Sequence, residues 1–177
     1  MSGIIKVLEI GSGLNPYQGR EDEEVIHLDC RHLPHIEQIW NLENFPYPFP
    51  ENYFDKIIAL DVLEHLSNNM KVVEQLWRIA KPGALFIVRV PYWSSCLAHR
   101  DPTHQLFFDE HSFDYFGAGN YSFYSHAKLK VLNINEEEAY PRLFRFLNLF
   151  SPRLVRGIKK HFLNMIKSLT FEMKFEK

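Results

Sequence analysis

This chain of 177 residues is poor in cysteine and has no long apolar run. Its two cysteines, Cys30 and Cys96, lie far apart without metal-binding spacing, which favours a reduced, cytoplasmic protein. No stretch approaches the length of a membrane span, and the first ten residues resemble a strand rather than a signal peptide. The length suits one domain with a sizeable core, so we expect residues 1–177 to form a single domain.

The chain also lacks the motifs that bind phosphate at a helix N-terminus. The apolar run Ile4–Ile10 ends in the turn "GSG", but Pro16 stands where a dinucleotide-binding motif has its third glycine, and no Gly-Lys-Ser/Thr follows. Only eleven residues separate Gly13 from the next apolar run at Val25. A crossover between parallel strands usually needs about a dozen or more. We therefore expect a βαβ unit whose first crossover helix is shortened.

Apolar periodicity indicates alternating strands and helices along the chain. Strands are expected at Ile4–Ile10, Val25–Leu28, His35–Leu42, Phe54–Leu60, Ala84–Val90, Leu129–Ile134 and Leu169–Phe175. Helices are expected at Asn68–Ala80, Asp109–Phe116 and Pro152–Lys167. This order predicts an α/β fold with a Rossmann-like, mostly parallel sheet and an antiparallel C-terminal edge.

A glycine turn without a full helix suits S-adenosylmethionine better than a dinucleotide. This molecule has no phosphate, so the glycines need only let the backbone approach the ligand. Glu9, before the turn, can contact the cationic methionine end. Asp29, at the end of the second strand, can accept hydrogen bonds from both ribose hydroxyls.

Four ordered blocks carry a family resemblance: "VLEIGSG", "HLD", "FPYPFPENYFDKIIALDVLEHL" and "LWRIAKPGALFIVRVP". Over about residues 4–92 the chain resembles the class I S-adenosylmethionine-dependent methyltransferases of the small "type 11" kind. The resemblance implies that the cofactor-binding residues are Glu9, Gly11, Gly13, Asp29, Cys30, Asn41, Leu42, Asp61, Val62 and His65.

The resemblance also distributes these residues along the cofactor. Those of the glycine turn and those after strand four, Asp61, Val62 and His65, contact the methionine end, Asp29 holds the ribose, and Asn41 with Leu42 faces the adenine. Each has a structural alternative. The glycines can form a tight turn, Asp29 can cap a loop, Asn41 can be a turn residue, and Glu64 with His65 can cap the next helix.

The segment after the fifth strand, residues 91–111, is rich in groups suited to an acceptor site. Ligands of open α/β sheets bind beyond the carboxyl ends of the strands. We predict His104 or His99 as a general base oriented by Asp101, with Arg100 holding an anionic group and Tyr92 contacting the acceptor. Alternatively, residues 101–103 form a turn into which His104 packs. His99, Asp101 and His104 have metal-binding side chains, but their spacing does not predict convergence, so no metal is expected.

These residues predict methyl transfer from S-adenosylmethionine to a small molecule or a glycan or lipid precursor, by in-line displacement. The alternative is a non-catalytic module of the same fold that serves as a partner or regulatory subunit. A nucleic-acid acceptor is disfavoured, because residues 1–140 carry a net charge of −9 and no "NPPY"-type motif is present. The identity of the acceptor cannot be derived from these residues.

The C-terminal residues 141–177 carry a net charge of +7. The expected helix Pro152–Lys167 combines an apolar face with Arg153, Arg156, Lys159 and Lys160. Because a shortened crossover would leave part of a sheet face uncovered, we expect this helix to pack on its own domain or on a second subunit in a homodimer. The alternative is that it lies on an anionic membrane surface.

Overall fold

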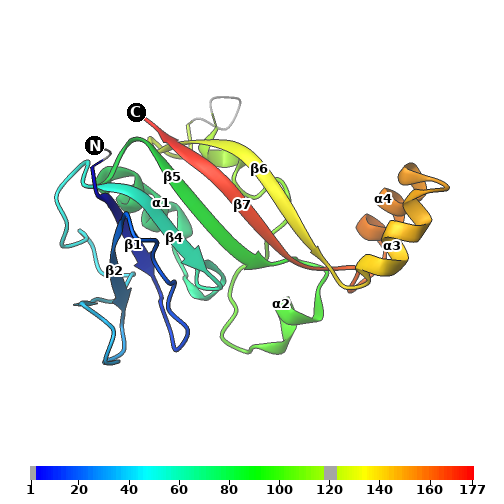
Figure 1. Ribbon diagram of the computed structural model, residues 1–177, viewed down its shortest axis with the longest axis horizontal. Coiled ribbons are helices and arrows are strands. Elements are labelled where there is room, and N and C mark those ends of the chain that lie inside the picture. The colour runs from blue at the N-terminus through cyan, green and yellow to red at the C-terminus, as the bar shows by residue number, and fades with distance from the viewer. Residues whose placement is uncertain (1–2, 118–122) are drawn as a thin grey trace.

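The computed structural model describes residues 3–117 and 123–177. Their core is one seven-stranded sheet in the order β3-β2-β1-β4-β5-β7-β6 (Figure 1). The strands are β1 (Ile5–Ile10), β2 (Glu23–Asp29), β3 (Gln38–Ile39), β4 (Phe54–Leu60), β5 (Ala80–Pro91), β6 (Lys128–Glu138) and β7 (Ile166–Glu176). The helices are α1 (Asn69–Ile79), α2 (Cys96–Arg100), α3 (Pro141–Asn148) and α4 (Pro152–His161), with short 3₁₀ turns at Leu63–His65 and Asp114–Phe116.

The first five strands are parallel, and β7 runs antiparallel to both of its neighbours, β5 and β6, which confirms the predicted fold class. β1 and β4 lie in the middle of the parallel half and are apolar and buried along most of their length, as strands covered on both faces are. β3 is much shorter than the expected strand His35–Leu42, and its two residues pair only with the end of β2.

Helix α1 covers one face of the sheet. The side chain of Asn68 caps its N-terminus by accepting a hydrogen bond from the backbone N–H of Lys71. Its buried side is apolar and consists of Val72, Val73, Leu76 and Ile79. The helix ends at Ile79, one residue before the expected end at Ala80, and β5 starts at the next residue.

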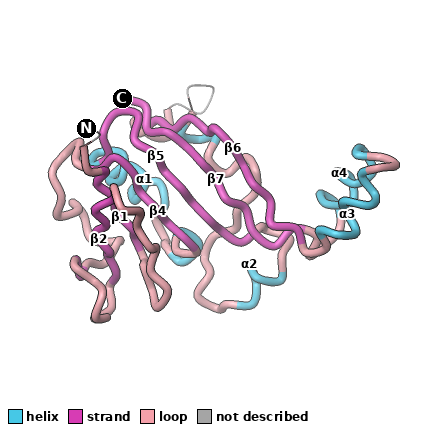
Figure 2. The backbone as a smooth tube through the Cα atoms, viewed as in Figure 1, coloured by secondary structure: helices cyan, strands magenta, loops and turns pink. Residues whose placement is uncertain are grey.

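No helix follows β1 in the structure, as the short crossover predicted: residues 11–22 form turns and an irregular loop (Figure 2). Polar contacts hold this loop against the sheet. The Tyr17 hydroxyl donates to Glu23 at 2.8 Å and accepts from Lys56 Nζ at 2.9 Å. Lys56 also reaches Glu23 at 2.8 Å. A buried ion pair and one tyrosine thus replace part of a helix at this face.

The helix expected at Asp109–Phe116 is reduced to the 3₁₀ turn Asp114–Phe116. Asp109 does not cap it. Its carboxylate instead accepts hydrogen bonds from the backbone N–H of His111 and from the Ser112 hydroxyl. A side chain that bonds the backbone two residues later favours a turn over a continuing helix.

The C-terminal helix differs from the prediction in length and in packing. It ends at His161, and an additional helix, α3, precedes it; together they form a hairpin beyond the end of the sheet (Figure 1). The chain itself covers only part of the expected apolar face, since Val155 and Ile166 are buried but Leu154 and Phe162 are exposed. Covering the rest would require a second subunit or another partner, which stays a prediction. Within the described residues, no helix has the length and apolar character needed to cross a bilayer.

Candidate functional site

The loops that follow β1, β2, β4 and β5 meet at the carboxyl edge of the sheet. Gly11 and Gly13 both have positive φ, +63° and +59°. A Cβ on Gly11 would lie 2.4 Å from Cγ2 of Val62, so the turn after β1 touches the turn after β4 and leaves no room for a side chain. Asp61, between β4 and Val62, also has a positive φ of 54°.

A first cavity of about 320 Å³ opens at this edge. Eight of the residues expected to bind the cofactor line it: Gly11, Asp29, Cys30, Asn41, Leu42, Asp61, Val62 and His65. Arg31, Trp40 and Leu66 complete the lining and were not singled out from the sequence. The structure therefore brings together residues from four separate segments of the chain.

Asp29 contributes a buried carboxylate to the first cavity. Its carboxylate is 5% exposed and accepts hydrogen bonds from the backbone N–H groups of Gly13 and Arg31, both at 2.9 Å. Burial opposes ionisation, but the hydrogen bonds from Arg31 and Gly13 outweigh it and lower the pKa of Asp29 to about 2. At neutral pH this group is an ionised acceptor. The Arg31 side chain that also reaches it is half exposed and can be displaced by hydroxyl donors.

Glu9 and Gly13 were expected at the methionine end but lie outside this lining. Glu9 is buried, accepts a hydrogen bond from the backbone N–H of Tyr17 at 2.9 Å, and contacts His27 Nδ1 at 2.7 Å. It therefore connects β1 to the crossover loop and to β2. Gly13 contacts the ring of His35 through its carbonyl, at 3.0 Å.

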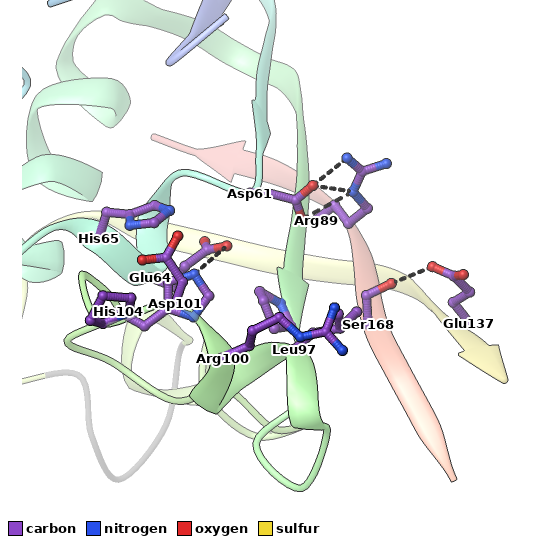
Figure 3. A pocket seen from close by; sticks show the side chains of 12 residues that line it. Asp61, Glu64, His65, Arg89, Leu97, Arg100, Asp101, His104, Glu137 and Ser168 are labelled. Carbon is purple, nitrogen blue, oxygen red and sulfur yellow. Dashed lines mark hydrogen bonds and ion pairs between the residues drawn. The ribbon is translucent and has the colours of Figure 1, made fainter. Parts of the chain in front are cut away.

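A second cavity, of about 550 Å³, lies beside the first (Figure 3). Its walls come from the turn after β4, the carboxyl end of β5, the loop around α2, and the paired strands β6 and β7. The lining residues are Asp61, Glu64, His65, Arg89, Pro91, Leu97, Arg100, Asp101, Pro102, His104, Glu137 and Ser168. Arg100, Asp101 and His104 were expected here from the sequence; Glu64, Arg89, Glu137 and Ser168 were not.

Three side chains converge in the second cavity: Glu64, His65 and His104. One ligand atom from each lies within 4.8 Å of the other two. His104 Nε2 is 4.0 Å from Glu64 Oε1, and the two imidazole rings pack edge to face at 4.6 Å (Figure 3). Burial raises the pKa of Glu64 to about 7, and burial together with the neighbouring His104 lowers the pKa of His65.

The orientation of His104 differs from the prediction. Its Nδ1 lies 3.0 Å from the carbonyl of Ala98, so the ring is fixed by backbone on one side and faces Glu64 on the other. Asp101 does not hold this ring through its carboxylate, which accepts from the backbone N–H and the hydroxyl of Thr103. The expected 101–103 turn is therefore present, with His104 packed behind it.

His99 and Tyr92 lie outside the second cavity's lining. His99 contacts the carbonyl of Trp93 at 3.0 Å and packs against Phe107. Tyr92 is buried, and its hydroxyl contacts Glu110 at 3.4 Å. The structure thus does not bring these two expected residues to His104. His99 lies within the five-residue helix α2, whereas His104 follows the turn after that helix, and the two rings have different partners.

Asp61 and His65 line both cavities, which therefore share a wall. Asp61 forms a bidentate ion pair with Arg89 through Nε and Nη2, with Nε at 3.0 and 3.1 Å from the two carboxylate oxygens. This pair connects the end of β4 to β5 at the boundary. The two cavities are therefore neighbours at the carboxyl ends of the strands.

Comparison with known proteins identifies the fold and a domain. Residues 20–88 match the family model described as a methyltransferase domain. No curated protein matched this sequence.

Solved structures match the chain over nearly its full length. An S-adenosylmethionine-dependent methyltransferase from Archaeoglobus fulgidus has a TM-score of 0.65 at 14% identity, covering 98% of this chain and 87% of that one. The cyclase SpnF has a TM-score of 0.62 at 11% identity, covering 99% and 77%. Phosphoethanolamine N-methyltransferase 2 of Haemonchus contortus, solved with S-adenosyl-L-methionine, has a TM-score of 0.56 at 13% identity, covering 99% and 49%.

Proposed function

We propose that this chain transfers a methyl group from S-adenosylmethionine, because its fold is similar to that of solved S-adenosylmethionine-dependent methyltransferases and residues 20–88 match the methyltransferase-domain model. The cofactor occupies the first cavity, and the acceptor, a small molecule or a glycan or lipid precursor, occupies the second. One observation carries the proposal: Asp61 and His65 line both cavities, so donor and acceptor meet at one wall.

The first cavity suits the cofactor at both of its ends. Asp29 is ionised and presents its carboxylate for the two ribose hydroxyls. Asn41 and Leu42 line the side where an adenine would lie, and Trp40 adds an aromatic surface beside them. Asp61, which also lines the second cavity, and the adjacent Val62 are the residues that would contact the methionine end. When bound, the cofactor supplies an electrophilic methyl carbon on a sulfonium sulfur.

The second cavity suits an acceptor that carries an anionic group and a nucleophilic oxygen or nitrogen. Arg89 and Arg100 line it, and Arg100 is exposed on the cavity side of α2. His104 is placed to take up a proton, because its Nδ1 points at the Ala98 carbonyl and leaves Nε2 as the accepting nitrogen. Much of the acceleration in methyl transfer comes from alignment of the two reactants, which the shared wall provides.

Titration calorimetry with S-adenosylhomocysteine tests the cofactor part of the proposal. We expect one binding site per chain in the micromolar range. Absence of binding at millimolar S-adenosylhomocysteine would overturn the proposal. The non-catalytic alternative, in contrast, predicts no turnover with any acceptor.

Turnover tests the acceptor part. Candidate acceptors with and without a carboxylate or phosphate are screened with methyl-labelled cofactor. We expect label transfer only to the anionic compounds. We also expect His104→Ala to lower turnover while leaving S-adenosylhomocysteine affinity unchanged, since His104 lies outside the first cavity. A parallel loss of thermal stability and turnover would assign His104 to packing instead.

A further inference from the structure

We propose that Glu64, His65 and His104 form a site for one divalent transition-metal ion that opens into the second cavity. The metal's part in turnover rests on the proposed function, but its binding does not.

Glu64 supplies a carboxylate without a partner. The residue is 1% exposed, and neither of its carboxylate oxygens has a hydrogen-bond donor among the residues that the structure describes. A buried acid left in this state costs free energy unless a proton or a cation neutralises it. The nearest side-chain nitrogen, His104 Nε2, is 4.0 Å away, too far for a hydrogen bond. The space between these two atoms is where a bound cation would lie.

His104 presents a lone pair to this space. Its Nδ1 lies 3.0 Å from the carbonyl oxygen of Ala98, and a carbonyl can only accept, so Nδ1 carries the hydrogen. In the neutral ring Nε2 is then an acceptor, and it faces Glu64, which is another acceptor. Two acceptors that face each other inside a protein are unfavourable unless a proton or a cation lies between them, and a separation of 4.0 Å is too long for a shared proton.

His65 is fixed in the same tautomer by a longer chain of contacts. The Thr103 hydroxyl donates to the Asp101 carboxylate at 2.7 Å, because the carboxylate is ionised and can only accept. Thr103 Oγ1 therefore accepts from His65 Nδ1, 2.8 Å away. Nε2 of His65 is the nitrogen left with a lone pair. In metal-binding histidines the nitrogen that does not bind the metal commonly donates a hydrogen bond that fixes the ring. Here that partner is a carbonyl for His104, and for His65 a hydroxyl that itself donates to a carboxylate.

The spacing of the three ligands fits a metal after a small inward movement. Metal–nitrogen and metal–oxygen bonds of about 2.0–2.2 Å place tetrahedral ligands about 3.3 Å apart. The ligand atoms here lie within 4.8 Å of one another. Glu64 and His65 belong to a 3₁₀ turn and His104 to a loop, so neither movement requires a change in a strand or a long helix.

The ligand types indicate which metals would bind. Two imidazoles and one carboxylate favour zinc, manganese, iron or cobalt over magnesium and calcium, which prefer oxygen ligands. Three protein ligands leave coordination positions open, and the second cavity borders all three. A bound metal would lower the pKa of an acceptor hydroxyl in the second cavity. The metal would then activate this hydroxyl in place of His104, to which the proposed function assigns that role.

Metal binding is tested directly on chelator-treated protein. Zn²⁺ and Mn²⁺ are titrated by calorimetry, and Co²⁺ by its visible absorption, without cofactor or acceptor. We expect one ion per chain and an absorption band of the intensity typical of four- or five-coordinate Co²⁺. Glu64→Gln, which keeps the shape of the side chain, and His65→Ala should each weaken binding by at least about tenfold.

His111→Ala is the matched control, since His111 is an exposed histidine beside the carboxylate of Asp114 and far from the cavity lining. Three results would overturn the proposal. They are equal weakening of metal binding by the control, unchanged metal binding in Glu64→Gln, and no metal binding by the wild type. If Glu64→Gln fails to fold, as judged by thermal unfolding, His65→Ala and the wild-type Co²⁺ spectrum still decide. S-adenosylhomocysteine titration of the same samples shows separately whether the proposed function fails.

Discussion

Two residues of the first cavity, Asp29 and Gly11, show how single positions determine the site. Asp29 ends β2 and is held ionised by the hydrogen bonds of Gly13 and Arg31. In the proposed cofactor site, the exposed Arg31 side chain would give way to the ribose hydroxyls, while the two backbone donors would continue to hold the carboxylate. The carboxylate is therefore oriented before the ligand arrives.

Asp29→Ala should weaken S-adenosylhomocysteine binding at least tenfold. A hydrogen bond to a charged group contributes about 1.5–3 kcal/mol, and the variant loses its acceptor. Calorimetry measures the change. Glu21→Ala is the control, because Glu21 is an exposed acid in the loop between β1 and β2. This variant should bind as the wild type does. Unchanged affinity in Asp29→Ala would remove this residue from the ribose site.

Gly11→Ala should destabilise the protein by about 1–3 kcal/mol, because the new Cβ meets Val62 and the backbone has a left-handed φ. Chemical denaturation measures the loss. Val62→Ala in the same chain should recover only part of it, since shortening Val62 relieves the contact but not the backbone strain. Full recovery would show that the φ angle costs nothing, and no loss in the single variant would show that the turn after β1 rearranges freely.

At the scale of elements, the β1–β2 crossover shows how a short loop replaces a helix. Glu23 begins β2 and Lys56 lies on β4, and both side chains are almost fully removed from solvent. Burial opposes the ionisation of Glu23, but hydrogen bonds from Lys56, the Arg20 backbone and Tyr17 outweigh it and lower its pKa to about 2. The ion pair between Lys56 and Glu23 covers part of a sheet face that a full crossover helix would cover with apolar side chains.

This pair gives the folded state an acid-sensitive component. The folded-state pKa of Glu23, about 2, lies below its ordinary value of 4.5, so the unfolded chain binds the proton more tightly. The stabilisation is present above pH 4.5 and is lost as the pH falls from there toward 2. In Glu23→Gln the midpoint of urea unfolding should depend less on pH within this window. An identical pH profile in wild type and variant would contradict the assignment.

Lys56→Met should be more damaging than the double variant Glu23→Gln, Lys56→Met. The single change leaves a buried carboxylate unpaired, which costs about 3 kcal/mol or more, whereas the double change removes both charges. Urea unfolding at neutral pH measures both. Equal stability of the two variants would show that water or another cationic group pairs with the Glu23 carboxylate when Lys56 is absent.

At the scale of the whole molecule, the α3–α4 hairpin stands apart from the sheet (Figure 1). Its exposed apolar side chains are Leu143, Phe146, Leu149, Phe150, Leu154, Phe162 and Leu163. Leu149 and Phe150, between the two helices, are 80% and 74% exposed. Arg142, Arg145, Arg153 and Arg156 are exposed beside them and form no ion pair within the described part of the chain.

We expect this hairpin to bind an anionic membrane surface. Two copies meeting hairpin to hairpin would bring like charges together, whereas anionic lipid complements the arginines and takes up the apolar side chains. Flotation with vesicles of phosphatidylcholine and phosphatidylglycerol should recover the protein at low salt but not at high salt. Arg153→Glu with Arg156→Glu should abolish recovery, and Lys130→Glu with Lys174→Glu, two exposed lysines on β6 and β7, should not. A dimer in light scattering without flotation would overturn this expectation.

The sequence by itself determined the features that depend on neighbouring residues. The span of β4, Phe54–Leu60, follows from its apolar run, and the absence of a helix after β1 follows from the short distance between Gly13 and Val25. Eight residues of the first cavity were named in advance through the family resemblance. Its residues stand directly after strand ends, and the carboxyl ends of parallel strands meet at one edge of a sheet.

Only the tertiary structure decided which residues meet across the second cavity and which faces stay open. Glu64 and His104 lie far apart in the sequence, and the pattern around Glu64 is equally that of a helix cap, so its burial without a donor was not predictable. His99 lies close to His104 in sequence but has other partners, because His99 lies on α2 whereas His104 follows the turn at residues 101–103. The apolar face of α4 was visible in the sequence, but amphipathic periodicity shows only that a face seeks a partner, whereas packing determines whether the chain itself supplies one.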